Sequence, residues 1–241
     1  MRLLHTKETR SGGFRIEEFQ NEEALEYAIL SHTWNEEEVT FQEILTGRPV
    51  PKKGFQKIKD CCARARQDGI EYAWVDTCCI DKTSSAELSE AINSMYRWYE
   101  NAVVCYTYLV DIEDESEIAA SRWFTRGWTL QELIAPLNML FFNKSWMFLG
   151  TKDGLRDTLA LLTGIPPGVL SGQDDLDSIS VAQRLSWAAF RVTTRPEDRA
   201  YSLLGIFGIN MPLIYGEGGR AFIRLQEEIL KVFDDQTIFA W

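Results

Sequence analysis

Apolar and polar positions follow two different periods along the first 150 residues, and the change of period predicts the order of the elements. Short apolar runs have the length of strands, and they cover residues 27–33, 71–77, 102–109 and 138–142. The segments between them repeat apolar side chains at helical spacing, over residues 56–68, 84–99 and 121–135. Strand and helix therefore alternate, which predicts a parallel sheet with helices on both faces.

Boundary residues support several of these helices. In the segment 84–99, apolar side chains recur in steps of four, three and four, and Ser84 or Ser85 precedes them as a helix cap. Asp68-Gly69 ends the helix before it, and Pro136 stops the helix after it. The sequence therefore predicts an α/β core over residues 27–150.

The remaining chain, residues 151–241, has a different pattern. Gly and Pro separate helical stretches, which cover residues 152–163, 181–190, 197–207 and 219–233. A strand-like run, Thr237–Trp241, comes last. We expect one domain, 1–241, whose mainly helical extension packs on the core, with charged residues 195–199 forming a buried ionic network there.

Composition and charge narrow the classes of function. The chain has 241 residues with a formal net charge of −11, which argues against nucleic acid or an anionic membrane as the main partner. It contains no apolar run of about 18 residues, so we expect no membrane span. The beginning of the chain is too polar for a secretory signal, and five cysteines that include two adjacent pairs do not resemble a disulfide framework. These features predict a reducing compartment, the cytosol or the nucleus, and we expect a cytoplasmic location.

Metal and nucleotide motifs are scarce. With two histidines and no C-x-x-C, no metal site is expected. The known phosphate-binding loops are absent from the sequence. Gly216-Glu-Gly-Gly219 precedes a helix and offers backbone N–H groups to a phosphate, although a plain turn and helix start is favoured.

Polar residues at the ends of two predicted strands mark the expected ligand site. In open parallel sheets, ligands bind at the carboxyl ends of the strands. Residues 31–34 and 76–81 lie there, and they include Ser31, His32, Trp34 and Asp76. A Cys78 or Cys79 nucleophile activated by His32 is geometrically conceivable, but core packing of the cysteines is favoured, and His32 is favoured as a hydrogen-bonded loop residue.

Glu132 has two interpretations. It lies four residues after Trp128, so the two share one helix face, and an indole beside a carboxylate can cradle a flat ring. Residues 129–132 also spell a capping box, which the pattern alone favours. Arg122 and Arg126 precede them, either as surface residues or as a clamp for phosphate oxygens.

Four segments carry a resemblance to a known family. Residues 27–34 (YAILSHTW), 74–82 (WVDTCCIDK), 90–99 (EAINSMYRWY) and 122–133 (RWFTRGWTLQEL) resemble the fungal heterokaryon incompatibility (HET) domain. Residues 193–205 and 215–222 look like the tail of the same family. Asn35 stands where the family usually has Gly. The resemblance implies a role in programmed cell death during fungal non-self recognition, within a larger parent protein.

The same resemblance implies a fold and a chemistry. The HET fold is similar to Toll/interleukin-1 receptor (TIR) domains, which are flavodoxin-like, and many TIR domains hydrolyse NAD with a glutamate in a Trp-x-x-x-Glu context. Trp128-Thr-Leu-Gln-Glu132 matches that context, so the resemblance implies that Glu132 is catalytic. NAD is then the substrate and no cofactor is needed. Ser31, His32 and Asp76 would line the site, Trp128 or Trp34 would face a ring, and Arg122 or Arg126 would reach the diphosphate.

The resemblance also implies that clustering of several copies activates the domain. Such domains are commonly fused to, or activated by, a nucleotide-binding oligomerisation and repeat module, and self-association completes the pocket. The net charge of −11 opposes self-association until a partner module raises the local concentration. Two other functions stay open, namely a non-enzymatic death adaptor that acts through homotypic contacts and a sensor that binds NAD-like nucleotides without turnover.

Overall fold

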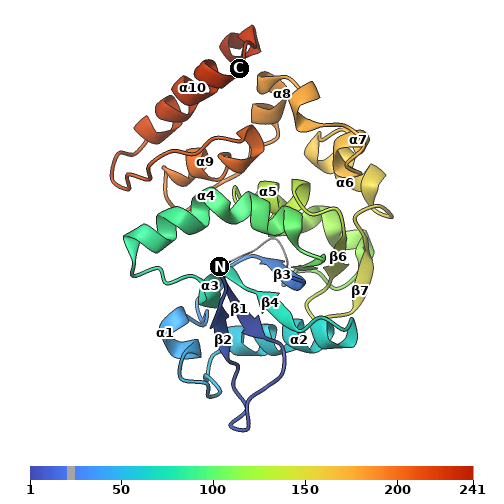
Figure 1. The fold of residues 1–241 in the computed structure, drawn as a ribbon. Coiled ribbons are helices and arrows are strands. Elements are labelled where there is room, and N and C mark those ends of the chain that lie inside the picture. The colour runs from blue at the N-terminus through green and yellow to red at the C-terminus, as the bar shows by residue number, and fades with distance from the viewer. Residues whose placement is uncertain (21–24, 241) are drawn as a thin grey trace.

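The computed structural model describes residues 1–20 and 25–240, and this part of the chain folds around a seven-stranded mixed sheet (Figure 1). The strand order is β2-β1-β4-β3-β5-β6-β7. The four central strands run parallel, and β1, β2 and β7 pair antiparallel at the two edges. The strands are β1 (Arg2–His5), β2 (Ile16–Glu18), β3 (Tyr27–His32), β4 (Tyr72–Trp74), β5 (Val104–Tyr108), β6 (Met139–Phe142) and β7 (Phe148–Thr151).

The α/β class and the parallel pairing of the four predicted strands are therefore confirmed, whereas the three strands that pair antiparallel at the edges were not predicted. The three antiparallel strands are three or four residues long, too short for alternation to be recognised in the sequence. Numbered along the chain, the parallel strands lie in the order 2-1-3-4, which is the beginning of the flavodoxin-like order. In that order the second strand lies on one side of the first strand and the third strand lies on the other. The topological switch point of the sheet therefore lies between β3 and β5.

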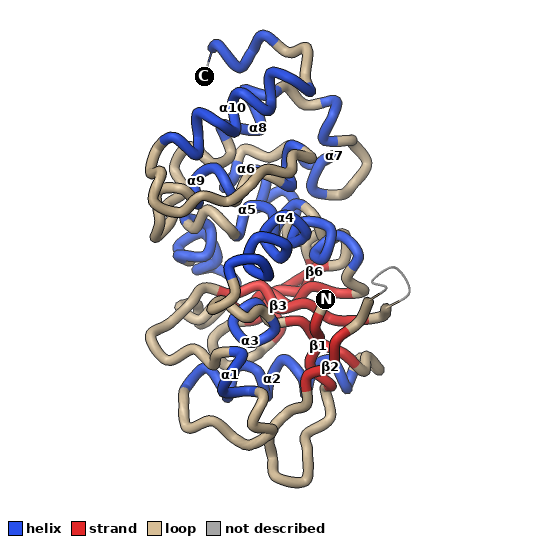
Figure 2. The backbone as a smooth tube through the Cα atoms, turned by 60° about the vertical axis from the view of Figure 1, so that its left-hand side comes forward, coloured by secondary structure: helices blue, strands red, loops and turns tan. Residues whose placement is uncertain are grey.

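Two helical layers cover the sheet. Figure 2 shows α2 (Lys53–Gln67) below it, with the short α1 (Phe41–Ile44) and α3 (Asp76–Cys79), and α4 (Ser85–Asn101) and α5 (Thr129–Ile134) above it. Ser84 caps α4 by accepting a hydrogen bond from the Glu87 backbone N–H, as expected. In the described ranges, no helix is both long and apolar enough to cross a membrane.

The predicted helix 121–135 is broken in two. A 3₁₀-helix, η2 (Arg122–Thr125), ends before Gly127, and α5 begins at Thr129. Gly127 donates its N–H to the Val192 carbonyl at 2.9 Å, and a Cβ on Gly127 would lie 2.5 Å from the Thr193 side chain. Pairing with residues 192–193 therefore interrupts the helix at a glycine, where any larger residue would have to displace the Thr193 side chain.

The C-terminal extension stacks on the layer of α4 and α5 and not on the sheet itself (Figure 2). Its helices α6, α8 and α10 begin and end close to the predicted ranges, whereas the range 197–207 is divided between α9 and η4. The predicted strand at the end is wrong, because residues 236–240 form a 3₁₀-helix, and Trp241 lies outside the described residues. The elements are α6 (Arg156–Thr163), α7 (Pro167–Leu170), η3 (Leu176–Ser178), α8 (Val181–Ser186), α9 (Asp198–Tyr201), η4 (Gly205–Phe207), α10 (Arg220–Val232) and η5 (Gln236–Ala240). A further 3₁₀-helix, η1 (Glu115–Ala120), belongs to the α/β part of the chain and precedes η2.

In place of the expected ionic network among residues 195–199, Glu197 binds the glycine-rich turn at residues 216–219. The Glu197 carboxylate accepts the backbone N–H groups of Gly216 and Gly218 at 2.8 and 2.9 Å. Both glycines have positive φ, which aims these N–H groups into one hollow. The anion bound by this glycine-rich turn is thus the protein's own carboxylate, so the amides of Gly216 and Gly218 are not vacant for a phosphate.

Candidate functional site

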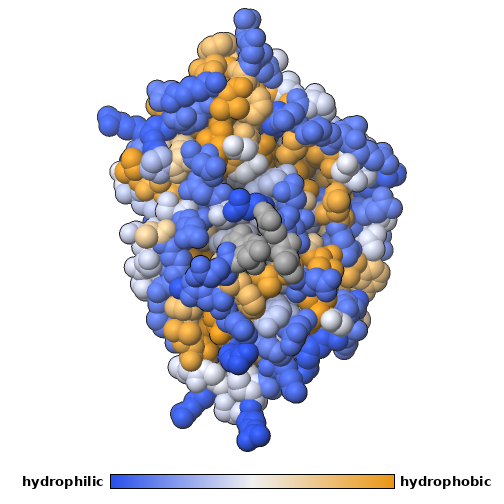
Figure 3. Space-filling view, viewed as in Figure 1, coloured by the Kyte–Doolittle hydropathy of each residue, from blue (hydrophilic) through white to orange (hydrophobic). Residues whose placement is uncertain are grey.

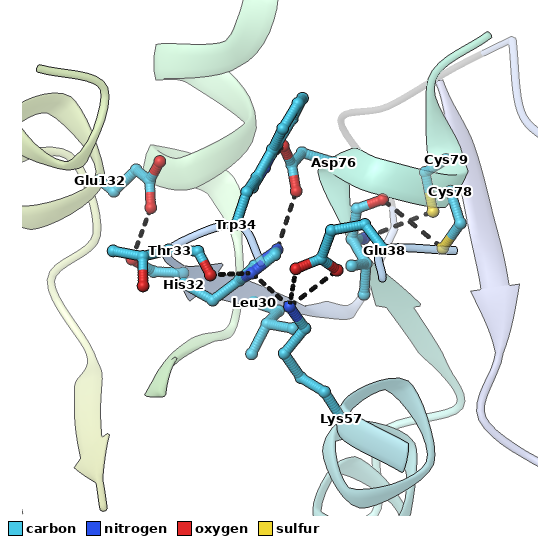
Figure 4. Close-up of polar contacts among 12 residues, drawn as sticks. Leu30, His32, Thr33, Trp34, Glu38, Lys57, Asp76, Cys78, Cys79 and Glu132 are labelled. Atoms are coloured by element: carbon cyan, nitrogen blue, oxygen red, sulfur yellow. Dashed lines mark hydrogen bonds and ion pairs between the residues drawn. The ribbon is translucent and has the colours of Figure 1, made fainter. Parts of the chain in front are cut away.

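The carboxyl ends of β3 and β4 bring the predicted residues to one edge of the sheet. Ser31 and His32 are the last two residues of β3, and Asp76 opens the short helix α3 that follows β4. Successive side chains of a strand point to opposite faces. Ser31 therefore faces α5 and His32 faces α2, so the predicted site divides into two clusters (Figure 4).

The first cluster surrounds Glu132 on α5. Ser31 Oγ donates to Glu132 Oε2 at 2.5 Å, and the indole Nε1 of Trp123 donates to Ser31 Oγ at 2.8 Å. Glu132 is 7% exposed and Trp123 is fully buried. The Tyr99 hydroxyl also interacts with the carboxyl group, while it donates to the Leu30 carbonyl at 3.1 Å. Glu132 is thus held by side chains from β3 and α4.

Burial controls the charge of this carboxyl group. It raises the pKa of Glu132 to about 8, the Ser31 hydrogen bond opposes the rise, and the nearby Asp76 carboxylate adds to it. The buried guanidinium of Arg191 also lowers the pKa, although it donates to the Arg126 carbonyl and to the Thr129 hydroxyl. At pH 7 Glu132 is therefore mainly protonated and neutral.

The capping-box interpretation of Glu132 is wrong. The Thr129 hydroxyl donates to the carbonyl groups of Trp123 and Arg126, and the residue before the helix, Trp128, makes no side-chain cap. Glu132 reaches out of its helix to Ser31. The carboxyl group is available to the site because it does not cap the start of the helix.

Two of the predicted partners of Glu132 lie elsewhere. The Trp128 side chain forms a hydrogen bond with Asp198 in the helical extension, and the indole beside the Glu132 cluster is that of Trp123. Arg126 Nη2 donates to the Thr194 hydroxyl at 3.3 Å, also in the extension. The shared helix face that the spacing predicted does not form, because Trp128 precedes the helix.

Arg122 does reach the edge of the sheet. Its Nε donates to the Thr33 hydroxyl at 3.1 Å, and its Nη2 donates to the Asn35 side-chain oxygen at 2.6 Å. Arg122 is exposed. The Asn35 side chain thus ties the loop after β3 to η2, and Asn35 is not among the residues with positive φ in the described chain.

The second cluster surrounds His32. Its Nε2 lies 3.0 Å from Asp76 Oδ1, and its Nδ1 lies 2.7 Å from the Lys57 ammonium. Lys57 comes from α2 and is paired with both carboxylate oxygens of Glu38 at 2.7 and 2.8 Å. A chain of polar contacts therefore runs Glu38–Lys57–His32–Asp76 beneath the edge of the sheet (Figure 4).

These contacts define the state of His32. A lysine ammonium only donates, so Nδ1 accepts from Lys57 and the ring proton sits on Nε2, where it is donated to Asp76. Lys82 and His32 outweigh burial and hold the pKa of Asp76 below its usual range. Asp76 is therefore an anion fixed by its neighbours, and His32 is the hydrogen-bonded residue that the sequence favoured.

The outer end of this chain is an accessible indole. Trp34 donates its Nε1–H to Asp76 Oδ2 at 2.8 Å and is 50% exposed. Lys82 Nζ lies 3.6 Å from the centre of the Trp34 ring and 3.7 Å from Asp76. Asp76 therefore fixes the indole and the cation beside it, and the ring is presented at the surface.

The cysteine alternative does not fit. Cys78 and Cys79 are packed in the core, and burial raises the pKa of Cys78 well above its ordinary value. The favoured interpretation, core packing, is confirmed. Within residues 1–20 and 25–240, no group of His, Cys, Asp and Glu side chains has the arrangement of a metal site.

Comparison with known proteins identifies the region around this site. The family model for heterokaryon incompatibility protein (HET) matches residues 27–119. The curated relative "Vegetative incompatibility protein HET-E-1" of Podospora anserina is 48% identical over 219 residues. The match covers 85% of this chain and 16% of that protein. Residues 27–119 form a HET domain.

Two further comparisons complete the result. Residues 220–241 match a domain of unknown function (DUF8212), and this range contains α10. No solved structure matches the chain. The chain spans 16% of the length of the HET-E-1 protein, so that relative contains much sequence that has no counterpart here.

The two clusters lie differently on the HET match. The whole His32 cluster, from His32 to Lys82, falls within residues 27–119, whereas Glu132 lies beyond the match and contributes to the site by folding against Ser31. Sequence reasoning missed Lys57, Lys82 and Trp123. Lys57 looked like one of many polar residues of an amphipathic helix, and only its 5% exposure distinguishes it.

Proposed function

We propose that this chain is an effector domain of fungal vegetative incompatibility that cleaves the N-glycosidic bond of NAD when it is clustered. Its membership of the HET family and its likeness to a vegetative incompatibility protein support the biological role. The observation that carries the chemistry is the position of Glu132, a buried carboxyl group hydrogen-bonded to the last-but-one residue of β3, beside the topological switch point between β3 and β5.

Cleavage of the N-glycosidic bond of NAD needs few catalytic groups. Nicotinamide leaves NAD as a neutral molecule, so no general acid is required, and the ribose left behind develops positive charge. A carboxylate beside the ribose stabilises that cation and holds its hydroxyl groups. Water then adds to the ribose carbon, releases a proton and gives ADP-ribose; attack by a group of the nucleotide itself gives the cyclic product.

The resting site is closed to this reaction. Glu132 is 7% exposed and mainly protonated at pH 7, and only its ionised form can stabilise the ribose cation. Contact with solvent would lower its pKa because solvation favours the charged form. We therefore propose that self-association separates Ser31 from Glu132 and admits NAD, with Trp34 facing a ring and Arg122 near the diphosphate. The module that drives this clustering would act in the cytoplasm.

One observation favours a second candidate function. Glu132 lines neither the small pocket beside Gly127 nor the large groove between the end of α5 and the end of α10. A fully closed carboxyl cluster also serves a death-signalling adaptor that oligomerises without catalysis, in which the Ser31 bond only ties α5 to the sheet. The two functions differ in whether clustering opens the site.

The deciding experiment measures nicotinamide release from NAD by protein fused to an inducible dimeriser. We expect release after dimerisation, and a decrease of about 100-fold or more in Glu132→Gln, because Gln keeps the size but cannot ionise. Glu90→Gln, an exposed site on α4, is the matched control and should keep the wild-type rate. Equal rates for the two variants would remove Glu132 from catalysis, and no release by dimerised wild type would favour the adaptor.

A further inference from the structure

A large groove lies on the opposite side of α5 from the sheet. It has a volume of about 1090 Å³ and is bounded by α4, the end of α5, the segment after α7, η4 and the end of α10. Its apolar lining includes Leu137, which is 70% exposed, and Val232, which is 65% exposed, together with the partly buried Phe233. Apolar side chains are exposed in several places over the extension (Figure 3).

The charges in this groove have one sign. Five carboxylate residues line it, and its lining residues include no Lys, Arg or His; the five are Glu100, Asp174, Asp175, Asp177 and Asp234. The buried Arg184 pairs with Asp177 at 3.5 Å from below. The other four carboxylates surround an apolar surface without a lining cation to offset them.

We propose that the groove binds a basic amphipathic helix of a partner protein. Apolar side chains of such a helix would cover Leu137 and Phe233, while its Lys and Arg residues would face the carboxylates. A helix about 10 Å across occupies roughly 120 Å³ per residue, so the hollow accommodates about nine residues, or two to three turns. The groove thus has the size, the polarity and the charge of a helix-binding site.

Charge also argues against a second copy of this chain as the occupant. The chain has a net charge of −11, and its surface would meet like charge in the groove. Phosphate groups of a nucleic acid would be repelled for the same reason. The groove residues belong to the helical extension and to α4 and α5, so this proposal does not depend on the NAD chemistry.

The test uses a designed probe, a fluorescein-labelled 14-residue amphipathic helix of Leu and Lys, with binding followed by fluorescence anisotropy. A peptide with every Lys replaced by Glu is the charge control. We expect the Leu/Lys peptide to bind wild type, to bind more weakly as salt screens the charges, and the Leu/Glu peptide not to bind. Equal binding of the two peptides would contradict the proposal.

Matched triple variants locate the site. E100Q/D174N/D234N removes three groove carboxylates and should weaken binding at least tenfold. E90Q/E115Q/D157N removes the same charge from exposed positions outside the groove and should change binding less than twofold. Leu137→Ser tests the apolar surface and should also weaken binding, and urea unfolding of each variant verifies the fold. Equal weakening by the two triples would show a general charge effect and overturn the site. So would sedimentation that shows a dimer strengthened by the groove triple, because the occupant would then be a second copy.

Discussion

Two carboxyl groups on opposite sides of β3 have opposite protonation states. Glu132 is hydrogen-bonded by neutral groups from Ser31 and Tyr99, and burial raises its pKa to about 8. Asp76 is partly buried, but Lys82 and His32 hold its pKa below the usual range. Their strand contacts, Ser31 and His32, are consecutive residues.

The comparison shows that burial alone does not set the charge of a carboxyl group. Burial disfavours the anion in both clusters and so raises the pKa of the carboxyl group. A neighbouring cation stabilises the anion and lowers the pKa again. The Asp76 cluster is therefore an ionised hydrogen-bond network with a structural role, and it holds Trp34 at the surface. The Glu132 side keeps a proton that a change of structure can release, as the proposed function requires of a carboxyl group that acts only when it is ionised.

The ionic side should be disrupted most by removing Lys57. Lys57→Met keeps the size of the side chain but leaves Glu38 and His32 without their buried partner, so we expect unfolding to become easier by about 3 kcal/mol. Urea unfolding measures the change. Lys53→Met alters an exposed lysine at the start of the same helix and should cost less than 0.5 kcal/mol or so. A loss below 1 kcal/mol or so for Lys57→Met would show that the network contributes little.

The neutral side predicts a dependence of stability on pH through Glu132. Between about pH 5 and pH 8 the unfolded chain ionises Glu132 while the folded chain keeps the proton, so rising pH lowers the free energy of unfolding. Below pH 4 or so both states are protonated and the effect disappears. Glu132→Gln has no such proton, so its stability relative to wild type should rise by at most about 1.4 kcal/mol per pH unit across this window.

Urea unfolding at pH 5, 6, 7 and 8 compares wild type, Glu132→Gln and the exposed control Glu90→Gln. Because all other titrating groups are shared, the difference between two curves isolates residue 132. The control difference should be independent of pH. A Glu132→Gln difference that is also flat would mean that Glu132 is ionised in the folded protein, and the contrast with Asp76 would be lost.

The smallest effect is expected at the surface of the ionic cluster. Lys82→Gln removes the cation over the Trp34 ring and one counter-charge of Asp76, at a cost of about 0.5–1 kcal/mol, since Lys82 is partly exposed. High salt should reduce this cost. Lys144→Gln, a half-exposed lysine paired with Glu113 at the far edge, is the control. A cost above 2 kcal/mol or so would place Lys82 in the core of the network.

Local pattern predicted the elements whose side chains repeat over a long enough window. The strands at residues 27–32, 104–108 and 139–142 were recognisable as short apolar runs, because they are buried on both faces. The helices α2, α4 and α10 were recognisable because burial of one face imposes a period of 3.6 on their side chains. The HET resemblance came from residues 27–34, 74–82, 90–99 and 122–133, which overlap these elements only in part. The position of Ser31, His32 and Asp76 at the carboxyl edge followed from the rule for parallel strands.

Other features depend on contacts between distant residues. The break at Gly127 requires residues 192–193, the Trp128 bond requires Asp198, and the Glu197 carboxylate binds amides some twenty positions later. The short antiparallel strands at the edges likewise exist through their pairing. Sequence by itself determined the parallel core and named both carboxyl groups; tertiary structure alone decided that one is neutral and the other charged, because pKa depends on which donors and cations folding brings within a few ångströms.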